Sequence, residues 1–256
     1  MDSIEREVSS PKDLLVAAGD EGVRRIIVAA HLSDLPTLRL SPGQTLQSRD
    51  LRMSLRFAPG QDGLQLTTDN QVENLELRAD PPRRAIFNDT TVERFGRIVL
   101  RNLSVEGIVE LVARDRMRGG HVEIHDLDIV AADARSYEQR PKGYGVEVIP
   151  GALTLWNQSS DPAVIVTADL TGLNAGRAGA PVRGSGIFVS GAGETGGKLM
   201  IRRLETGPVH SDGGIAAGTP DTITGGVFVV SGAFIDSVRN RGPVTTYGAN
   251  DMVLDN

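Results

Sequence analysis

The strongest constraint on the fold is a short motif that recurs along the chain: Asn or Asp, then an apolar residue, any residue and a second apolar residue. Clear copies begin at Asn74, Asn102 and Asp126, which are 28 and 24 residues apart. Looser copies begin at Asp169 and Arg203. Recurrence at spacings of about 20–50 residues is typical of stacked structural repeats. The sequence therefore predicts a stack of similar units that differ in the length of their corners.

A second motif is a glycine followed by a short alternating strand. It begins at Gly63, Gly145, Gly186 and Gly226, and the last three are 41 and 40 residues apart. Alternating apolar and polar residues place one face of each strand toward an interior and the other toward solvent. One coil cannot bury that face alone, but stacked coils would make parallel sheets around a continuous apolar column. We expect the Asn and Asp residues at strand entries to bond the turns and form ladders.

The two ends of the chain differ in composition. Of the 30 glycines, 21 lie from Gly143 onward, which predicts many tight corners in that half because glycine permits positive φ. Residues 11–30 instead predict a helix and a first strand. Ser10 is a suitable N-cap, Pro11 suits the first helical position and Gly19 ends the helix.

The cap helix, the segment SPGQTL at residues 41–46, GLQL at 63–66 and VENLELRA at 72–79 together resemble the opening of pectate-lyase-like proteins. The resemblance covers roughly residues 11–255. It implies an all-β fold, a right-handed parallel β-helix (solenoid) with an N-terminal capping helix. The RxPxxR segment of pectate lyases, the NTD, DD, GHG and RIK set of polygalacturonases and the DPHE segment of alginate epimerases do not occur. The resemblance therefore implies the scaffold and leaves the reaction open.

Two other architectures are compatible with many short strands. A β-sandwich would show strands every 8–12 residues or so and two-residue turns, but the chain has only two Asp-Gly pairs and longer repeats. A division into two domains near residue 142, where the glycine content rises, is the other alternative. We expect a single β-helix domain over residues 1–256, with the cap helix and first strand at residues 11–30 and stacked coils at residues 50–256.

Charge and hydropathy bear on the partners and the location. The formal net charge of -6 gives no basic footprint for nucleic acid. No run of about 18 apolar residues suggests a membrane-spanning helix, and the charged residues 1–7 lack the apolar region of a secretory signal. We therefore expect a cytoplasmic protein without nucleic-acid or membrane partners. Residues 250–256 suggest a strand without a polar cap, so either the natural chain continues or a second copy covers this end in a homo-oligomer.

Three long polar connections are the candidate ligand-binding loops: residues 133–144, 174–185 and 207–224. Long connections carry function more often than the strands that they join. Because these three follow comparable strands in successive coils, we expect them to stack into one wall beside a cleft.

The catalytic pair that the sequence favours is His210 with Asp212. Histidine titrates near neutral pH and can act as a general base, and a nearby carboxylate can orient it. The alternative is that these residues belong to a turn-forming Ser-Asp-Gly-Gly segment beside an exposed histidine.

Substrate binding is expected from charged and aromatic side chains of the same region. Arginine offers forked hydrogen bonds to a carboxylate or sulfate, and tyrosine can stack on a sugar ring. The alternative for each is a solvated surface position. The candidates are Arg135, Glu138, Arg140, Arg177, Arg183 and Tyr247.

His121 and His125 lie four residues apart in a predicted strand. At strand spacing they share a face but lie about 13 Å apart, too far to bind one metal ion. The chain contains no cysteine and no phosphate-binding loop. We therefore assign no metal site and expect no cofactor, and Ca²⁺ binding at acidic corner loops is the alternative that stays open.

These observations favour a carbohydrate-directed β-helix protein, whether a divergent polysaccharide lyase, epimerase or hydrolase or a binder of an acidic or polyhydroxylated ligand. This rests mainly on analogy of fold. One alternative is a non-catalytic structural or binding module that forms a homo-oligomer. Another is a small-molecule isomerase or cyclase. The sequence leaves open whether the protein is an enzyme.

Overall fold

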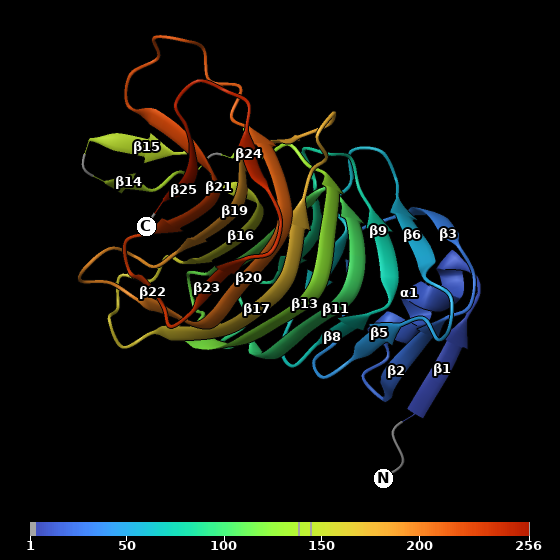
Figure 1. The fold of residues 1–256 in the computed structure, drawn as a ribbon. Coiled ribbons are helices and arrows are strands. Elements are labelled where there is room, and N and C mark those ends of the chain that lie inside the picture. The colour runs from blue at the N-terminus through green and yellow to red at the C-terminus, as the bar shows by residue number, and fades with distance from the viewer. Residues whose placement is uncertain (1–3, 138, 144, 256) are drawn as a thin grey trace.

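The protein is built almost entirely from parallel β-sheet. The structure, a computed structural model, describes residues 4–137, 139–143 and 145–255. Apart from the helix α1 (Pro11–Gly19), all elements of these residues are strands, and they form two sheets. The strands stack along one axis, with α1 at the N-terminal end and the C-terminus at the other (Figure 1). The predicted all-β fold with long parallel sheets is confirmed.

The helix α1 begins and ends where the sequence predicts. The backbone N–H of Asp13 donates to the Ser10 hydroxyl over 3.2 Å, and Pro11 is the first helical residue. Leu14, Ala17 and Ala18 are buried against the first strands. Among the described residues, no helix has the length and apolar character needed to cross a membrane.

The larger sheet has 15 strands, and its main path runs in the order β1-β2-β5-β8-β11-β13-β17-β20-β18. Its strands are β1 (Ile4–Val8), β2 (Val23–Val28), β3 (Leu32–Leu35), β5 (Thr45–Gln47), β6 (Met53–Phe57), β8 (Gln71–Glu73), β9 (Leu75–Arg78), β11 (Gly96–Glu106), β13 (Gly119–Ala131), β17 (Ile165–Ala175), β18 (Val182–Arg183), β20 (Lys198–Asp212), β22 (Ala233–Ile235), β23 (Val238–Asn240) and β24 (Val244–Thr246).

The smaller sheet has 10 strands and runs in the order β14-β15-β21-β19-β16-β12-β10-β7-β4, with β25 paired to β21. Its strands are β4 (Leu38–Arg39), β7 (Leu64–Leu66), β10 (Arg84–Asn88), β12 (Ile108–Ala113), β14 (Lys142–Gly143), β15 (Val146–Val148), β16 (Gly151–Asn157), β19 (Ser185–Ser190), β21 (Thr222–Val230) and β25 (Asp251–Asp255).

From β7 onward the chain alternates between the two sheets, and apart from β14, β15 and β18 each return pairs in parallel with the preceding pass. The register aligns apolar residues from pass to pass. Leu100 of β11 pairs with Ile124 of β13, which pairs with Leu170 of β17, and that residue pairs with Leu204 of β20. All four are 0% exposed. The alternation in the sequence thus produces continuous apolar rows, which join one buried cluster that extends from Val8 to Val227.

The long strands of the larger sheet bend at a column of left-handed residues. Asn74, Asn102 and Asp126 have φ values of 55°, 52° and 58°, and Gly172 follows with φ 67°. Asn and Asp tolerate this conformation better than other residues with a side chain. The Asn102 side-chain amide also donates to the Asn74 amide oxygen over 2.9 Å. The predicted ladder of strand-entry residues is therefore confirmed for this pair.

The structure corrects the repeat alignment of both motifs. β15, which follows Gly145, pairs antiparallel with β14, so it is part of an insertion. The partner of Ile187 in the preceding pass is Leu153, 34 residues earlier, whereas Ile187 and Val227 pair as predicted, 40 residues apart. The Asp169 copy is also displaced, because Leu127 pairs with Leu173. A long strand has an apolar residue at every second position, so the alternation alone does not show which of these residues pairs with a given residue of the neighbouring strand.

The β-sandwich alternative is wrong for the described residues. Sandwiches are built from antiparallel neighbours. Here the pairing of β14 with β15 is antiparallel and every other strand pair of the described residues is parallel.

Candidate functional site

A groove of 440 Å³ crosses the solvent side of the larger sheet, beside its left-handed corners. We call it the Arg177 groove. It is lined by Arg52, Asn102, Leu103, Asp126, Asp128, Asn174, Gly176, Arg177, Ala178, Pro208 and His210. These residues come largely from β11, β13, β17 and β20 and from the segment after β17, so neighbouring strands build its floor.

The parallel register spaces the polar groups of the groove evenly. Asp128 of β13 pairs with Asn174 of β17, so two oxygen-bearing side chains lie side by side on adjacent strands. Asn102 and Asp126 occupy equivalent corners on β11 and β13. Adjacent strands are about 4.8 Å apart, so the groove presents hydrogen-bonding groups at that interval.

Two glycines leave space for these side chains. A Cβ at Gly172 would lie 2.4 Å from a carboxylate oxygen of Asp126, and the residue also has a left-handed φ. A Cβ at Gly207 would lie 2.2 Å from the amide oxygen of Asn174. Larger residues at these positions would displace the groups that line the groove.

The two carboxylates of the groove have different surroundings. Asp128 accepts two hydrogen bonds from the Arg177 guanidinium, at 2.9 and 2.6 Å. The hydrogen bond with Asp128 raises the pKa of Arg177, so the guanidinium stays charged. The carboxylate of Asp126 is exposed and forms no ion pair or hydrogen bond with another described side chain. Asp126 is therefore free to accept hydrogen bonds from a ligand.

His210 lies on this groove, but not with the partner that the sequence predicts. It belongs to β20 rather than to a loop, and its Nδ1 lies 3.0 Å from the Tyr247 hydroxyl. Asp212 is bonded instead to Arg183, and it accepts a second hydrogen bond from the backbone N–H of Gly214 over 2.8 Å. The structure therefore joins His210 to Tyr247 and does not join it to Asp212.

The three predicted connections do meet, at Arg183. This residue pairs with Asp212 of β20 and forms an isolated bridge with Asp133. The Arg135 guanidinium donates two hydrogen bonds, of 2.8 and 2.6 Å, to the Asp133 carboxylate. A Cβ at Gly214 would lie within about 3 Å of both guanidinium groups, 2.9 Å from Arg183 and 3.0 Å from Arg135. The two arginines therefore lie close together, each held by a carboxylate.

The remaining predicted residue of the first loop that can be placed is Arg140. Its guanidinium donates to the backbone oxygens of Arg135 (2.8 Å) and Tyr137 (3.4 Å) and lies 3.4 Å from a Glu147 carboxylate oxygen. It therefore fastens its own loop and does not reach the Arg177 groove. Glu138 lies outside the described residues.

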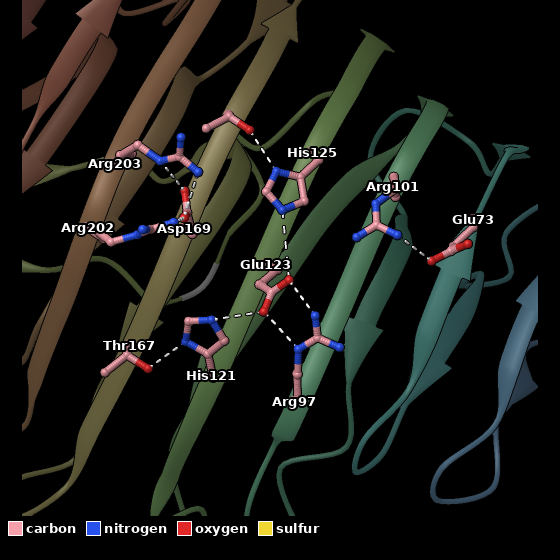
Figure 2. Close-up of polar contacts among 11 residues, drawn as sticks. Glu73, Arg97, Arg101, His121, Glu123, His125, Thr167, Asp169, Arg202 and Arg203 are labelled. Carbon is pink, nitrogen blue, oxygen red and sulfur yellow. Dashed lines mark hydrogen bonds and ion pairs between the residues drawn. The ribbon is translucent and has the colours of Figure 1, made fainter.

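A second polar cluster lies on the same sheet, nearer the beginning of the long strands (Figure 2). Glu123 of β13 is its centre. Arg97 of β11 donates two hydrogen bonds to its carboxylate, at 2.8 and 2.7 Å. His121 and His125 flank it, with Nε2 atoms 3.2 and 3.8 Å from its oxygens. The predicted shared face of the two histidines is confirmed, and the carboxylate between them was missed.

The next strand carries a second carboxylate that is paired with arginine. Asp169 of β17 is opposite Glu123 in the register and is only 5% exposed. Arg202 and Arg203 both donate to its carboxylate (Figure 2). Burial tends to raise the pKa of Asp169, but the hydrogen bonds from Arg203 and Arg202 outweigh burial and lower it.

The carboxylates of this cluster neutralise the neighbouring arginines and are not suited to acid–base catalysis. The hydrogen bond from Arg97 lowers the pKa of Glu123, so both carboxylates of the cluster stay ionised and neither can protonate a leaving group. The described residues contain no group of three or more His, Asp or Glu side chains arranged to hold a metal ion.

Sequence reasoning missed most of the groove. Asp126 and Asn102 were identified only as turn residues, and Asp128 and Asn174 were not singled out. The sequence could have indicated these four residues, because they lie at or beside the repeated strand entries and equivalent positions of stacked repeats lie side by side. Comparisons with models of protein families, with curated proteins and with solved structures gave no match for this chain.

Proposed function

We propose that the two sheets close into a right-handed parallel β-solenoid of the pectate-lyase-like kind, with α1 as its N-terminal cap. The alternation of the chain between two parallel sheets supports this. Connections between parallel strands are right-handed in about 98% of cases, which favours that hand.

We further propose that the Arg177 groove binds a polyhydroxylated carbohydrate chain that lies across the strands. The observation that carries this proposal is the row of hydrogen-bonding side chains on adjacent strands, at intervals of about 4.8 Å. An elongated ligand with hydroxyl groups on every unit can bond each strand in turn. The free carboxylate of Asp126 suits this role because it can accept bonds from two hydroxyl groups.

Within this proposal Arg177 supplies hydrogen-bond donors and His210 supplies an acceptor. Arg177 is held by Asp128, so its remaining N–H groups are presented in one orientation. His210 keeps the role of general base that the sequence suggests, with Tyr247 in place of Asp212 as its partner. A neutral imidazole that donates from Nδ1 to the Tyr247 oxygen keeps Nε2 available to accept a proton.

The test is affinity electrophoresis and calorimetry with neutral and acidic polysaccharides, for example glucomannan, xylan, alginate and polygalacturonate. We expect the protein to bind at least one of them. Asp126→Asn should weaken that binding roughly ten-fold or more, because a hydrogen bond to a charged group is lost. Asn tolerates the left-handed φ of this corner, so the variant should fold.

Asp34→Asn is the matched control. Asp34 is also an exposed aspartate with a left-handed φ, 56°, but it lies in β3 and does not line the groove. It should leave binding unchanged. Failure of every polysaccharide to bind, or an equal loss in both variants, would refute the proposal.

A second candidate function is a module that associates with a second copy through its last strands. Phe234 and Val238 are each 52% exposed there, and they line an apolar hollow of 340 Å³. Light scattering should then show a dimer that Phe234→Ser converts to a monomer. A monomeric protein at all concentrations would remove this candidate.

A further inference from the structure

The two ends of the stacked strands are covered differently. At one end α1 lies over the first strands, and its Leu14, Ala17 and Ala18 are part of the buried cluster. At the other end lie β22, β23, β24 and β25 (Figure 1). Among the described residues no helix covers these strands, because α1 is the only helix. The second end is therefore closed in another way or stays in contact with solvent.

Apolar side chains at this second end are exposed although their register partners are buried. Val238 of β23 pairs with Leu204 of β20, and the exposed fractions of the two residues are 52% and 0%. Leu254 of β25 pairs with Val227 of β21, and the exposed fractions are 53% and 2%. Residues that pair in register lie on the same face of a sheet. Val238 and Leu254 therefore continue the interior apolar rows of the two sheets into solvent.

The same end has free strand edges in both sheets. Within the described part of the chain, β22, β23 and β24 pair only with β20, and β25 pairs only with β21. A free edge presents backbone N–H and C=O groups that can pair with another strand. A partner that closes this end has to bring apolar side chains and strand edges together, and a second copy of the same end brings both.

The charges on the free edge of the larger sheet are complementary to themselves. Asp236 lies between β22 and β23, Arg239 lies in β23, and both are exposed. Neither forms an ion pair with another described residue, and Glu205, the register partner of Arg239, is paired with Arg241. One acidic and one basic side chain, three residues apart, are therefore available for a partner.

A two-fold axis at this edge satisfies the apolar side chains, the strand edges and the charges together. With the axis between positions 237 and 238 and perpendicular to the larger sheet, the strands of the two copies run in opposite directions and their edges pair antiparallel. Asp236 of each copy is then directly opposite Arg239 of the other, close enough for two ion pairs. The same axis brings the two smaller sheets edge to edge, so Val238 and Leu254 of both copies face one shared interior.

We propose that two copies of this chain join end to end about this axis, with β22, β23 and β24 of each copy paired to those of the other. This inference rests on the second candidate function, association with a second copy, and it names the surface, the symmetry and the charges that direct it. A two-fold contact uses the same surface on both copies, so it closes as a dimer and does not extend into a filament.

The first test reverses one charge at a time and measures the dissociation constant of the dimer by analytical ultracentrifugation at low salt. Asp236→Arg places two arginines opposite each other at both contacts, and Arg239→Asp places two aspartates there. Each variant should weaken association roughly ten-fold or more, because attraction is replaced by repulsion. The double variant with both changes restores opposite charges, and its dissociation constant should return to within about three-fold of the native value.

The second test mixes the two single variants in equal amounts. In a mixed dimer one copy contributes two positive charges at this edge and the other contributes two negative charges, so both ion pairs form. The mixture should therefore associate more tightly than either variant alone. Asp236→Asn and Arg239→Gln keep the test valid if a charge reversal fails to fold, and each should weaken the dimer roughly three-fold or more, because both ion pairs are lost.

Asp50→Arg and Arg56→Asp are the matched controls, because both residues are exposed and lie outside β22, β23, β24 and β25. They should leave the dissociation constant unchanged. A native protein that is monomeric at all concentrations would refute the second candidate function and this inference with it. A native dimer that tolerates the charge reversals, or reversed variants that associate no more tightly when mixed, would overturn this inference alone and leave association through another surface.

Discussion

Gln44 is expected to hold the helix α1 onto the first strands. Its side chain is 0% exposed, and its amide nitrogen lies within 3.0–3.1 Å of the carbonyl oxygens of Ala17, Asp20 and Val23. Its amide oxygen accepts from the backbone N–H of Ser41 over 2.9 Å. One side chain therefore connects the end of α1, the start of β2 and the turn before β5.

The substitution Gln44→Met keeps the length of this side chain and removes both polar atoms. The amide nitrogen of Gln44 has only two protons, so it donates about two hydrogen bonds to the three carbonyl oxygens. The bond that its amide oxygen accepts from Ser41 is the third. The variant therefore loses about three hydrogen bonds. Ala17 and Asp20 keep backbone partners, from Asp20 and Val23. At about 0.5–1.5 kcal/mol for each lost bond, the free energy of unfolding should fall by about 2–4 kcal/mol.

The assay is urea denaturation followed by circular dichroism, together with hydrogen exchange of residues 11–20. Exchange in α1 should accelerate more than exchange in β13 or β17, because the lost bonds are local. Gln61→Met is the matched control, since Gln61 is exposed, and it should change stability by less than about 0.5 kcal/mol. A loss below about 0.5 kcal/mol for Gln44→Met, or unchanged exchange in α1, would refute the reasoning.

Two further predictions concern the sheet faces. The pKa of Glu123 is lowered in the folded protein, so its ionised form stabilises the fold at pH values above the pKa of the unfolded state, near 4.3. This stability is lost as the pH falls through the pKa of the folded state. Between about pH 6 and pH 3 the melting temperature should therefore fall less in Glu123→Gln than in the native protein. Equal slopes would contradict this. Phe188 is 0% exposed and packs edge-on against Trp156, with centroids 5.9 Å apart. Phe188→Ala should cost about 3–5 kcal/mol in denaturant titrations and shift the Trp156 emission to the red, and an unshifted emission would argue against this packing.

The all-β fold with long parallel sheets could be predicted because its determinants are local. Alternating residues define strands, and the recurrence of Asn74, Asn102 and Asp126 marks the corners, where the left-handed φ restricts the residue type. The alignment of weaker copies could not be predicted in the same way. The strand after Gly145 alternates as well as any other, but its partner is the insertion strand β14.

The candidate site was only partly accessible from sequence. Arg183, Arg135 and Asp212 were expected near one another, and the structure brings them together. The pairing of His210 with Tyr247 depends on a contact 37 residues away along the chain, which no local pattern records. Asp126 has the same limitation, because its value as a ligand group follows from what neighbouring strands place beside it.

The charged side chains of Figure 2 have a consequence for how the chain finds its alignment during folding. A strand that slides by two residues keeps its apolar side chains in the interior, so the core alone tolerates this error. The same slide would separate Arg101 from Glu73, which now lie 3.0 Å apart, and would remove Arg97 from Glu123. The ion pairs on the solvent face thus favour one strand register over others that bury the same apolar side chains. Substitutions of these charged residues should therefore produce molecules with shifted strands before they produce unfolded ones.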